Sequence, residues 1–351
     1  MLSLFRLMDI DLLSEEQLSL LRTEVANAEN IVICCHVSPD GDALGSCLGW
    51  AEYLRHEGKD PAIIVPDQYP DFLQWLPNSE KVIRYDKRTA EANALIAAAD
   101  HIFFLDLNDI SRTEWMAGAL TEAKARRIVF DHHPDPVMEG VLMVSRPDLC
   151  STSEIVCRLV MQLGAFDALG KHFAVPVYCG MMTDTGGFTF NSTRPEIYHL
   201  ISLLLTKHIN KDKIYRNVYN NYSEDRMRLT GYVLYKKLRY ISSCHAAFFT
   251  LTRQDLARFH FIRGDAEGLV NMPLQIKGLK LSISLREDTA AKHLIRVSLR
   301  SVDDFPCNEM AAEFFNGGGH LNASGGKLHC SVDEAEQITM RAIEAYESKL
   351  K

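Results

Sequence analysis

The stretch that decides how the chain is interpreted is His36-Val37-Ser38-Pro39-Asp40-Gly41-Asp42-Ala43. The apolar run 31–35 before it predicts a buried strand, and residues 43–57 after it predict a helix. One imidazole and two carboxylates therefore lie at the C-terminal end of a strand, the edge where open α/β sheets form their sites. Pro39 stiffens this loop, and Gly41 is expected to let it turn sharply. Taken alone, an Asp-Gly-Asp loop is more often a solvated turn or a helix N-cap, so the interpretation depends on the rest of the chain.

Strands and helices alternate along the first half of the chain, which predicts βαβ units and a mainly parallel sheet. Further apolar runs predict strands at 61–65, 101–105 and 127–130. Helical patterns cover 12–29, 70–76, 89–99, 111–120, 151–164 and 172–183. Two of the strands end on polar groups, at Asp106 and at Asp131-His132-His133. We expect these groups at the same sheet edge as the first stretch.

The second half of the chain differs in character. Residues 195–239 are rich in helix formers and predict linking helices. Beyond them, strand-like runs at 240–251, 279–286 and 293–300 alternate with helices at 253–259, 306–315 and 333–349. We therefore expect an α/β protein with a mainly parallel-sheet N-terminal domain (1–193), linking helices (194–239) and a smaller α/β domain (240–351).

Composition is that of an ordinary globular protein, with 351 residues of which 47% are hydrophobic and 24% charged. The nine cysteines include no C-x-x-C pair, which predicts reduced thiols in a cytoplasmic protein. We expect no signal peptide at residues 1–11, and no apolar run approaches the ~20 residues needed to span a bilayer.

Charge is distributed unevenly. Residues 1–193 contain 15 Lys and Arg against 28 Asp and Glu, whereas residues 194–351 contain 23 against 18. The halves thus carry −13 and +5, which gives the overall −8. An acidic half that binds cations and a basic half suit a small phosphate-bearing substrate held between them, although such asymmetry is common between unrelated domains. No basic stripe suggests a protein that tracks long nucleic acid.

Six candidate metal ligands stand at the ends of predicted elements, each expected in a loop: His36, Asp40, Asp42, Asp106, His132 and Asp184. Carboxylates and imidazoles without thiolates suit Mn²⁺, Mg²⁺ or Co²⁺ better than a structural zinc. Six ligands exceed the need of one catalytic ion, so they indicate two divalent ions with one bridging aspartate. Such ions lie roughly 3.5–4 Å apart, activate a shared water and neutralise charge at phosphorus. Hydrolysis of a phosphoester is the natural reaction.

Several short motifs resemble those of the DHH phosphoesterase superfamily: His36-x3-Asp40-x-Asp42-Ala43, Asp106, Asp131-His132-His133 and Thr183-Asp184-Thr185. Towards the C-terminus, Gly317-Gly318-Gly319-His320 with Ala323 and Gly325, and Ser298-Leu299-Arg300-Ser301, resemble the DHH-associated C-terminal domain of its first subfamily. The resemblance spans nearly the whole chain. The two-domain layout is similar to bacterial members that hydrolyse short oligoribonucleotides and the 3′-phosphate of 3′-phosphoadenosine 5′-phosphate (pAp).

The resemblance implies a role for each motif residue. One ion would be held by His36, Asp40 and Asp106, and the other by Asp42, Asp106, His132 and Asp184. The predicted catalytic residues are His133, Asp106 and Asp131. His133 would face the substrate phosphate as a cationic hydrogen-bond donor. Asp131 either orients a neighbouring histidine or caps the strand end.

The glycine run predicts a substrate-binding segment, because glycines let backbone N–H groups approach an anion closely. His320 would add a donor or stack on a base, while Arg300 would clamp a phosphate and Ser301 would add a hydroxyl donor. The alternative is a flexible surface loop. The predicted substrate-binding residues are Arg300, Ser301, Gly317, Gly318, Gly319 and His320.

We expect a two-metal phosphodiesterase or phosphatase that releases 5′-mononucleotides from short single-stranded RNA and dephosphorylates pAp. Neither long nucleic acid nor a membrane is an expected partner, and a homodimer is left open. The alternatives are a linear or cyclic dinucleotide phosphodiesterase, a pyrophosphatase or exopolyphosphatase, and a nucleotide-binding regulator without turnover. The family's pyrophosphatases carry an arginine- and lysine-bearing motif in their second domain that is not found here.

Overall fold

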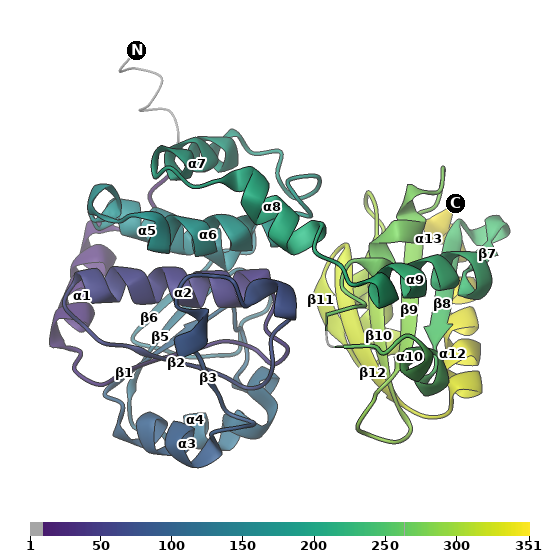
Figure 1. The fold of residues 1–351 in the computed structure, drawn as a ribbon, viewed down its shortest axis with the longest axis horizontal. Coiled ribbons are helices and arrows are strands. Elements are labelled where there is room, and N and C mark those ends of the chain that lie inside the picture. The colour runs from purple at the N-terminus through teal and green to yellow at the C-terminus, as the bar shows by residue number, and fades with distance from the viewer. Residues whose placement is uncertain (1–9, 263) are drawn as a thin grey trace. The chain divides into compact units, whose positions relative to one another are not determined.

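The computed structural model describes residues 10–262 and 264–351 (Figure 1). The chain forms two compact units, Met1–Asn221 and Tyr222–Lys351. Their boundary falls inside the segment expected to hold linking helices. The helices α7 (Pro195–Thr206) and α8 (Lys211–Tyr219) belong to the first unit, and α9 (Glu224–Tyr232) belongs to the second. Residues 1–9, within the stretch where no signal peptide is expected, lie outside the described residues.

The first unit is built on a parallel six-stranded sheet with the order β3-β2-β1-β4-β5-β6. The strands are β1 (Ile31–Cys34), β2 (Ala62–Val65), β3 (Ile83–Arg84), β4 (His101–Leu105), β5 (Arg126–Asp131) and β6 (Leu142–Ser145). The predicted parallel sheet is thus confirmed. The predicted strands do not include β3 and β6, which are two and four residues long and alternate buried with more exposed positions. Such short strands carry little periodic signal.

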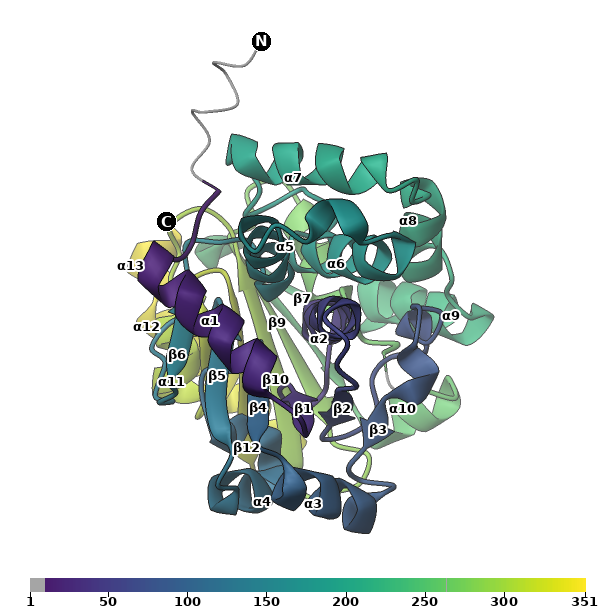
Figure 2. The ribbon, with the colours of Figure 1, turned by 90° about the vertical axis from the view of Figure 1, so that its left-hand side faces the viewer.

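Helices cover both faces of this sheet, as Figures 1 and 2 show. On one face lie α1 (Glu15–Asn27), α2 (Gly41–His56), α5 (Thr152–Gln162) and α6 (Lys171–Asp184), with α7 and α8 outside them. On the other lie α3 (Thr89–Ala98) and α4 (Ala117–Glu122). Because strand residues alternate between faces, Phe103 and Phe130 pack against Trp50 of α2, whereas Ile102 and Val129 join the core beneath α3 and α4.

The second unit contains a mostly antiparallel sheet with the order β11-β12-β10-β9-β8-β7, in which β8 and β9 run parallel. Its strands are β7 (Arg239–Ile241), β8 (Ala246–Leu251), β9 (Leu281–Glu287), β10 (Leu294–Ser301), β11 (Gly318–His320) and β12 (Ala323–His329). Its other helices are α10 (Arg253–Arg258), α11 (Cys307–Phe314), α12 (Val332–Ala345) and α13 (Glu347–Leu350). Gly318 and Gly319 of the glycine run lie in β11, which pairs with β12, so the run is part of a hairpin and not an irregular surface loop.

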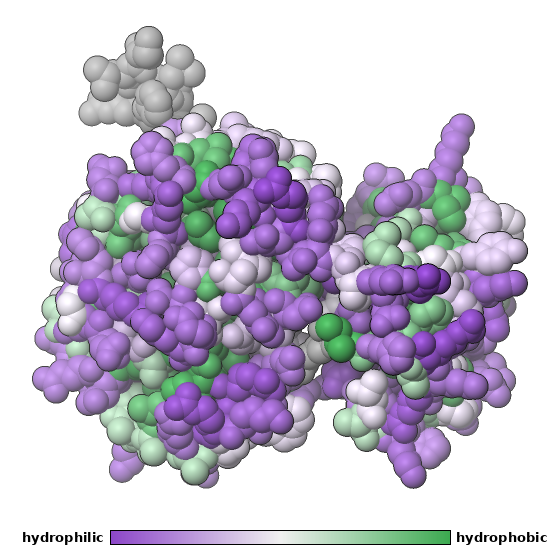
Figure 3. Space-filling model, in the orientation of Figure 1, coloured by the Kyte–Doolittle hydropathy of each residue, from purple (hydrophilic) through white to green (hydrophobic). Residues whose placement is uncertain are grey.

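Short helical turns complete the two units. The 3₁₀ turns are η2 (Asp71–Leu73), η3 (Ser79–Lys81), η4 (Ile110–Met116), η5 (Phe166–Ala168), η7 (Ser242–Cys244) and η8 (Leu269–Gln275), and η6 (Val233–Lys237) is a π-helical turn. In the view of Figure 3, hydrophilic residues cover most of the visible surface. Within 10–262 and 264–351, no helix has the length and apolarity required to cross a bilayer. All nine cysteines are free thiols.

Candidate metal centre

The six predicted metal ligands all lie in the first unit, at the ends of elements that meet at one sheet edge. His36 follows β1, Asp106 follows β4, and His132 follows β5. Asp40 is the N-cap of α2, and Asp42 lies in its first turn. Asp184 is the last residue of α6. Asp42 and Asp184 are thus helical, and the expectation that every ligand lies in a loop is corrected.

The two carboxylate oxygens of Asp40 have different surroundings. Its Oδ1 accepts hydrogen bonds of 3.0 Å from the backbone N–H groups of both Asp42 and Ala43, so it caps α2. Its Oδ2 lies 4.0 Å from Nε2 of His36. The N-cap and metal-ligand interpretations of the Asp-Gly-Asp stretch are therefore compatible.

The first cluster of possible ligands consists of His36, Asp40 and Asp106. Nε2 of His36 lies 3.2 Å from Oδ2 of Asp106. On the other side of the ring, Nδ1 lies 2.8 Å from the carbonyl oxygen of Val37 and donates to it. This bond orients the imidazole so that Nε2 faces the carboxylates, as an imidazole ligand requires.

The second cluster consists of Asp42, His132 and Asp184. Nε2 of His132 lies 3.4 Å from Oδ2 of Asp184, 3.8 Å from Oδ2 of Asp42 and 3.5 Å from Oδ1 of Asp106. Nδ1 of the same ring lies 3.4 Å from the carbonyl oxygen of Leu149. Nε2 is again the atom directed at the carboxylates.

Asp106 lies between the two clusters. Its Oδ2 faces His36 and its Oδ1 faces His132, so each oxygen serves one cluster. Its backbone adopts a left-handed conformation, with φ of 56°, which is uncommon for a residue other than glycine. Backbone strain of this kind concentrates at functional sites.

The carboxylates of the two clusters lie close enough to affect one another's pKa. Burial, together with Asp106 and Asp184, raises the pKa of Asp42 well above its ordinary value. Burial also disfavours the charged form of Asp106, but His133 and His36 outweigh it and hold its pKa well below the usual range. Each of these clusters combines one buried and one half-buried carboxylate with an inward-facing imidazole nitrogen and contains no thiolate. Such a donor set fits two divalent cations of the Mn²⁺ or Mg²⁺ type.

The N-terminus of α5 supports these carboxylates, which the sequence analysis did not foresee. The backbone N–H groups of Thr152 and Ser153 donate to Oδ2 and Oδ1 of Asp42, over 2.6 and 2.8 Å. The Thr152 hydroxyl donates to Oδ1 of Asp106 over 3.0 Å. An N-cap pattern at 151–154 is visible in the sequence, and the Ser151 hydroxyl does cap α5. The sequence does not indicate that the N–H groups of Thr152 and Ser153 donate to Asp42, because only tertiary packing brings them together.

Glycines let α2 and α6 approach closely enough to bring the aspartates together. A Cβ atom on Gly41 would lie 2.2 Å from Oγ1 of Thr183, and one on Gly45 would lie 2.5 Å from the carbonyl oxygen of Pro176. Gly41 is the first residue of α2, so its importance is the close approach and not the sharp turn expected from the sequence. In the sequence, this close approach is indicated by glycines spaced four residues apart along α2, at Gly41, Gly45 and Gly49.

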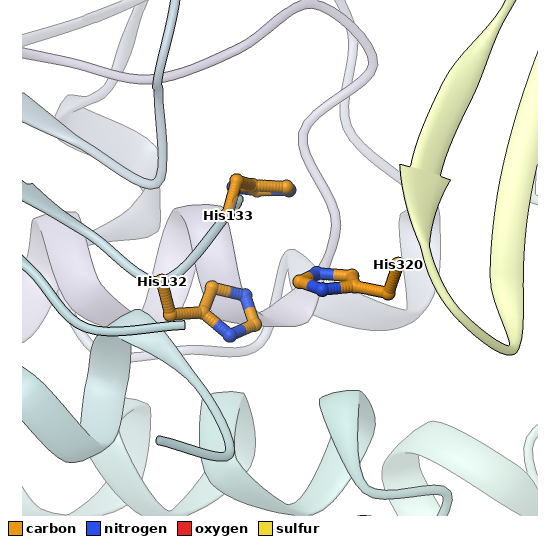
Figure 4. A group of neighbouring side chains, drawn as sticks. All are labelled: His132, His133 and His320. Carbon is orange, nitrogen blue, oxygen red and sulfur yellow. The ribbon is translucent and has the colours of Figure 1, made fainter. Parts of the chain in front are cut away.

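Asp131 orients His133, which is one of the two roles expected for it. Its Oδ1 lies 2.8 Å from Nδ1 of His133, and its Oδ2 accepts the backbone N–H of the same residue. Figure 4 shows the side chains of His132 and His133 at the end of β5, and that of His320 on β11. Burial outweighs the nearby carboxylates of Asp106 and Asp131 and lowers the pKa of His133 below its ordinary value.

The predicted substrate-binding side chains of β10 lie on opposite faces of the strand. Arg300 is on the half-exposed face, and Nη1 donates to the carbonyl oxygen of Leu299. Ser301 is on the buried face, where its hydroxyl donates to the carbonyl oxygen of Phe305 over 2.8 Å. The expectation that Ser301 offers a hydroxyl donor to substrate is corrected, because its proton is already engaged.

The glycines of β11 serve the β11–β12 hairpin in different ways. A Cβ atom on Gly317 would lie 1.8 Å from the carbonyl oxygen of Gly325, and Gly319 has a φ of 140°. Gly318 is exposed, and a Cβ atom there would meet nothing within 4 Å. Gly317 and Gly319 are therefore required by the hairpin, whereas Gly318 is free of that requirement.

Comparison with known families agrees with this architecture. Residues 30–181 match the model of the DHH family, N-terminal domain, and residues 248–349 match the DHHA1 domain. The chain therefore belongs to the DHH family, and it is a hydrolase of the phosphoesterase class.

Its relatives include named enzymes. "Bifunctional oligoribonuclease and PAP phosphatase NrnA" of Thermus thermophilus is 28% identical over 316 residues, which cover 89% of each chain. The Bacillus subtilis protein of that name is 26% identical and covers 91% of this chain and 95% of its own. A crystal structure of an exopolyphosphatase-related protein from Bacteroides fragilis superposes with a TM-score of 0.90, at 45% identity, and covers 96% of this chain and 98% of its own.

Proposed function

We propose that the chain hydrolyses short oligoribonucleotides to 5′-mononucleotides and removes the 3′-phosphate of pAp, using two divalent ions. The observation that carries this proposal is Asp106, whose two oxygens face two separate clusters of possible ligands. The substrate class is supported by the NrnA relatives, which match over most of their length.

In this mechanism one ion would be held by His36, Asp40 and Asp106, and the other would be held by Asp42, Asp106, His132 and Asp184. Bound divalent ions of this kind activate a water for attack on phosphorus and neutralise the charge that develops there. The residues of the chain set up this chemistry: Val37 and Leu149 orient the two imidazoles, and α5 positions Asp42. Asp131 positions His133, and the ring of His133 would face the substrate phosphate. We propose Mn²⁺ as the preferred ion.

Substrate contacts from the second unit are proposed for Arg300, His320 and the backbone of Gly318. Arg300 carries a guanidinium on the half-exposed face of β10, suited to a phosphate. Gly318 exposes its backbone without a side chain, and His320 supplies a ring for stacking or hydrogen bonding. A binding segment of a few residues suits a substrate of a few nucleotides.

A second candidate is hydrolysis of polyphosphate or pyrophosphate. It is favoured by the 45% identity to the protein described as exopolyphosphatase-related. The two candidates share the metal centre and differ in whether a nucleoside must be recognised.

The test is the release of mononucleotide or phosphate by the purified protein with Mn²⁺. The panel contains RNAs of two to five nucleotides, pAp, linear and cyclic dinucleotides, polyphosphate and pyrophosphate. Cleavage of the short RNAs and pAp supports the proposal. Turnover of polyphosphate or pyrophosphate alone would overturn it in favour of the second candidate, and turnover of dinucleotides alone would show a dinucleotide phosphodiesterase. Tight nucleotide binding with no turnover at all would contradict enzymatic function.

A further inference from the structure

Arg112 lies where three loops of the metal centre meet, although no motif includes it. It belongs to η4, a few residues after Asp106. Its carbonyl oxygen accepts the backbone N–H of Val37 over 2.8 Å, which ties η4 to the loop after β1. Its guanidinium reaches the loop after β5, since Nη2 lies 3.3 Å from Nε2 of His133. The positive charge is thus held beside the ligand clusters.

The guanidinium is held by neutral groups. Nη1 donates to Oδ1 of Asn108 over 3.0 Å, and Asn108 is itself fixed by its bond to the carbonyl oxygen of Pro134. Nδ1 of His133 is directed at Asp131, so Nε2 of that ring accepts from Arg112. Within the ranges that the structure describes, no carboxylate oxygen comes within the 4.0 Å ion-pair distance of this guanidinium.

These contacts leave N–H donors and the positive charge of Arg112 available to bind an anion. The two hydrogen bonds use two of the five N–H donors of a guanidinium. The side chain is half-buried, so its charge is less screened than that of a surface arginine. A guanidinium oriented in advance loses little conformational freedom when it binds a phosphate through two parallel N–H donors.

We propose that Arg112 is the cationic residue of the first unit that binds the substrate phosphate, with Asn108 and His133 as the residues that position it. This inference rests on the proposed function for the class of substrate, a phosphate ester. The guanidinium donates to two non-bridging oxygens of the phosphate and stabilises the negative charge that grows there during attack. His133 positions Arg112, because Nδ1 of its ring is held by Asp131 and Nε2 faces the guanidinium.

The test compares Arg112→Gln and Arg112→Lys with the wild type, with Arg127→Gln as the matched control. Arg127 is an arginine of β5 in the same unit, and its Nη2 donates to the backbone carbonyls of residues 120 and 121. Inorganic phosphate is titrated into Mn²⁺-saturated protein by calorimetry, and Mn²⁺ affinity is measured separately. Steady-state constants are taken on whichever substrate of the panel the wild type hydrolyses.

We expect Arg112→Gln to weaken phosphate binding at least about 10-fold and to lower kcat by about 10²-fold, with Mn²⁺ affinity unchanged. Arg112→Lys should recover part of the phosphate affinity but little of kcat, because an ammonium does not replace a two-pronged donor. Phosphate affinity within twofold of the wild type in both variants would overturn the proposal. Failure of the wild type to act on RNA and pAp would defeat the proposed function, yet the phosphate titration would still decide the role of Arg112.

Discussion

The backbone N–H of Thr152 donates a hydrogen bond of 2.6 Å to Oδ2 of Asp42, and the Thr152 hydroxyl donates one to Oδ1 of Asp106. A single residue at the start of α5 therefore donates to two carboxylates of the metal centre, Asp42 of the second cluster and Asp106 between the clusters. The N-terminus of a helix favours negative charge, because its first N–H groups have no partners inside the helix. α5 thereby offsets part of the cost of burying these carboxylates.

Thr152→Val removes the hydroxyl while keeping the shape of the side chain and the backbone bond to Asp42. We expect Mn²⁺ affinity to fall about 10-fold, as is typical when a partner of a ligating group is lost. The measurement is a calorimetric Mn²⁺ titration. Thr121→Val is the control, because the exposed Thr121 hydroxyl bonds only its own helix, at the carbonyl oxygen of Ala117. Equal Mn²⁺ affinity in the two variants would contradict the role of Thr152.

Glu154 connects the metal centre to the packing of the first unit. Its buried carboxylate accepts the backbone N–H of Cys150 and hydrogen bonds from Arg158 and Arg194. Arg158 is only 2% exposed, so Glu154→Gln would remove a negative charge that the buried guanidinium contacts over 2.6 Å. We expect a loss of stability of about 3–5 kcal/mol, measured by chemical denaturation.

The same variant should also weaken Mn²⁺ binding, because Cys150 adjoins Leu149, whose carbonyl oxygen orients His132. The control is Glu224→Gln, which breaks only an exposed pair with Arg228 and should leave both stability and Mn²⁺ affinity nearly unchanged. A Glu154→Gln protein as stable as the control would show that the buried network is unimportant.

The stability of the metal-free protein should depend on pH through His132. Burial acts to lower the pKa of His132, but the carboxylates of Asp184, Asp106 and Asp42 outweigh it and raise the pKa to about 9. A raised pKa means that the folded state binds the proton of His132 more tightly than the unfolded state does. The protonated His132 therefore contributes its full stabilisation below the ordinary pKa of 6.5, and this contribution is lost as pH rises towards 9.

Mn²⁺ competes with that proton, so the rise in melting temperature on adding Mn²⁺ should grow between pH 6.5 and 9. Melting curves with and without Mn²⁺ across this window provide the measurement. A His132→Gln control should lose most of the pH dependence. A rise in melting temperature that is constant with pH would count against this assignment.

Gly318 offers a separate test of the second unit. Because a Cβ atom at Gly318 would meet nothing within 4 Å, Gly318→Ala should fold normally. If its backbone approaches substrate, KM should rise severalfold with little change in melting temperature. Gly317→Ala, which collides with the carbonyl oxygen of Gly325, should instead lower the melting temperature. An unchanged KM in Gly318→Ala would remove the backbone of Gly318 from the proposed substrate contacts.

The sheet edge that carries the site was predictable because its signal is local. The run 101–105 coincides with β4, and parallel strands deliver their terminal residues to one edge. Strand alternation also predicts which side chains of a strand are buried. Along β10 it places Ser301 on the same buried face as Leu299, opposite Arg300.

Other features depend on contacts between residues far apart in the chain. Thr152 and Asp42 are 110 positions apart, and Arg112 and His133 are 21 apart. Arg112 lies in a helical pattern where an arginine is unremarkable, and nothing local indicates that its guanidinium reaches the end of β5. The glycine run was ambiguous for a similar reason, since the collision at Gly317 arises only when β11 pairs with β12.

The central claim is that Asp106 joins two metal sites, and counting bound Mn²⁺ tests it most directly. The measurement is Mn²⁺ per chain, combined with electron paramagnetic resonance to detect magnetic coupling between ions. Asp109→Asn is the control, because Asp109 caps η4 through the backbone N–H of Ser111 and is not among the proposed ligands. We predict two coupled ions in the wild type and in Asp109→Asn. In Asp106→Asn we predict loss of coupling and a fall in activity of more than about 100-fold. One uncoupled ion per wild-type chain, or full activity in Asp106→Asn, would contradict the account.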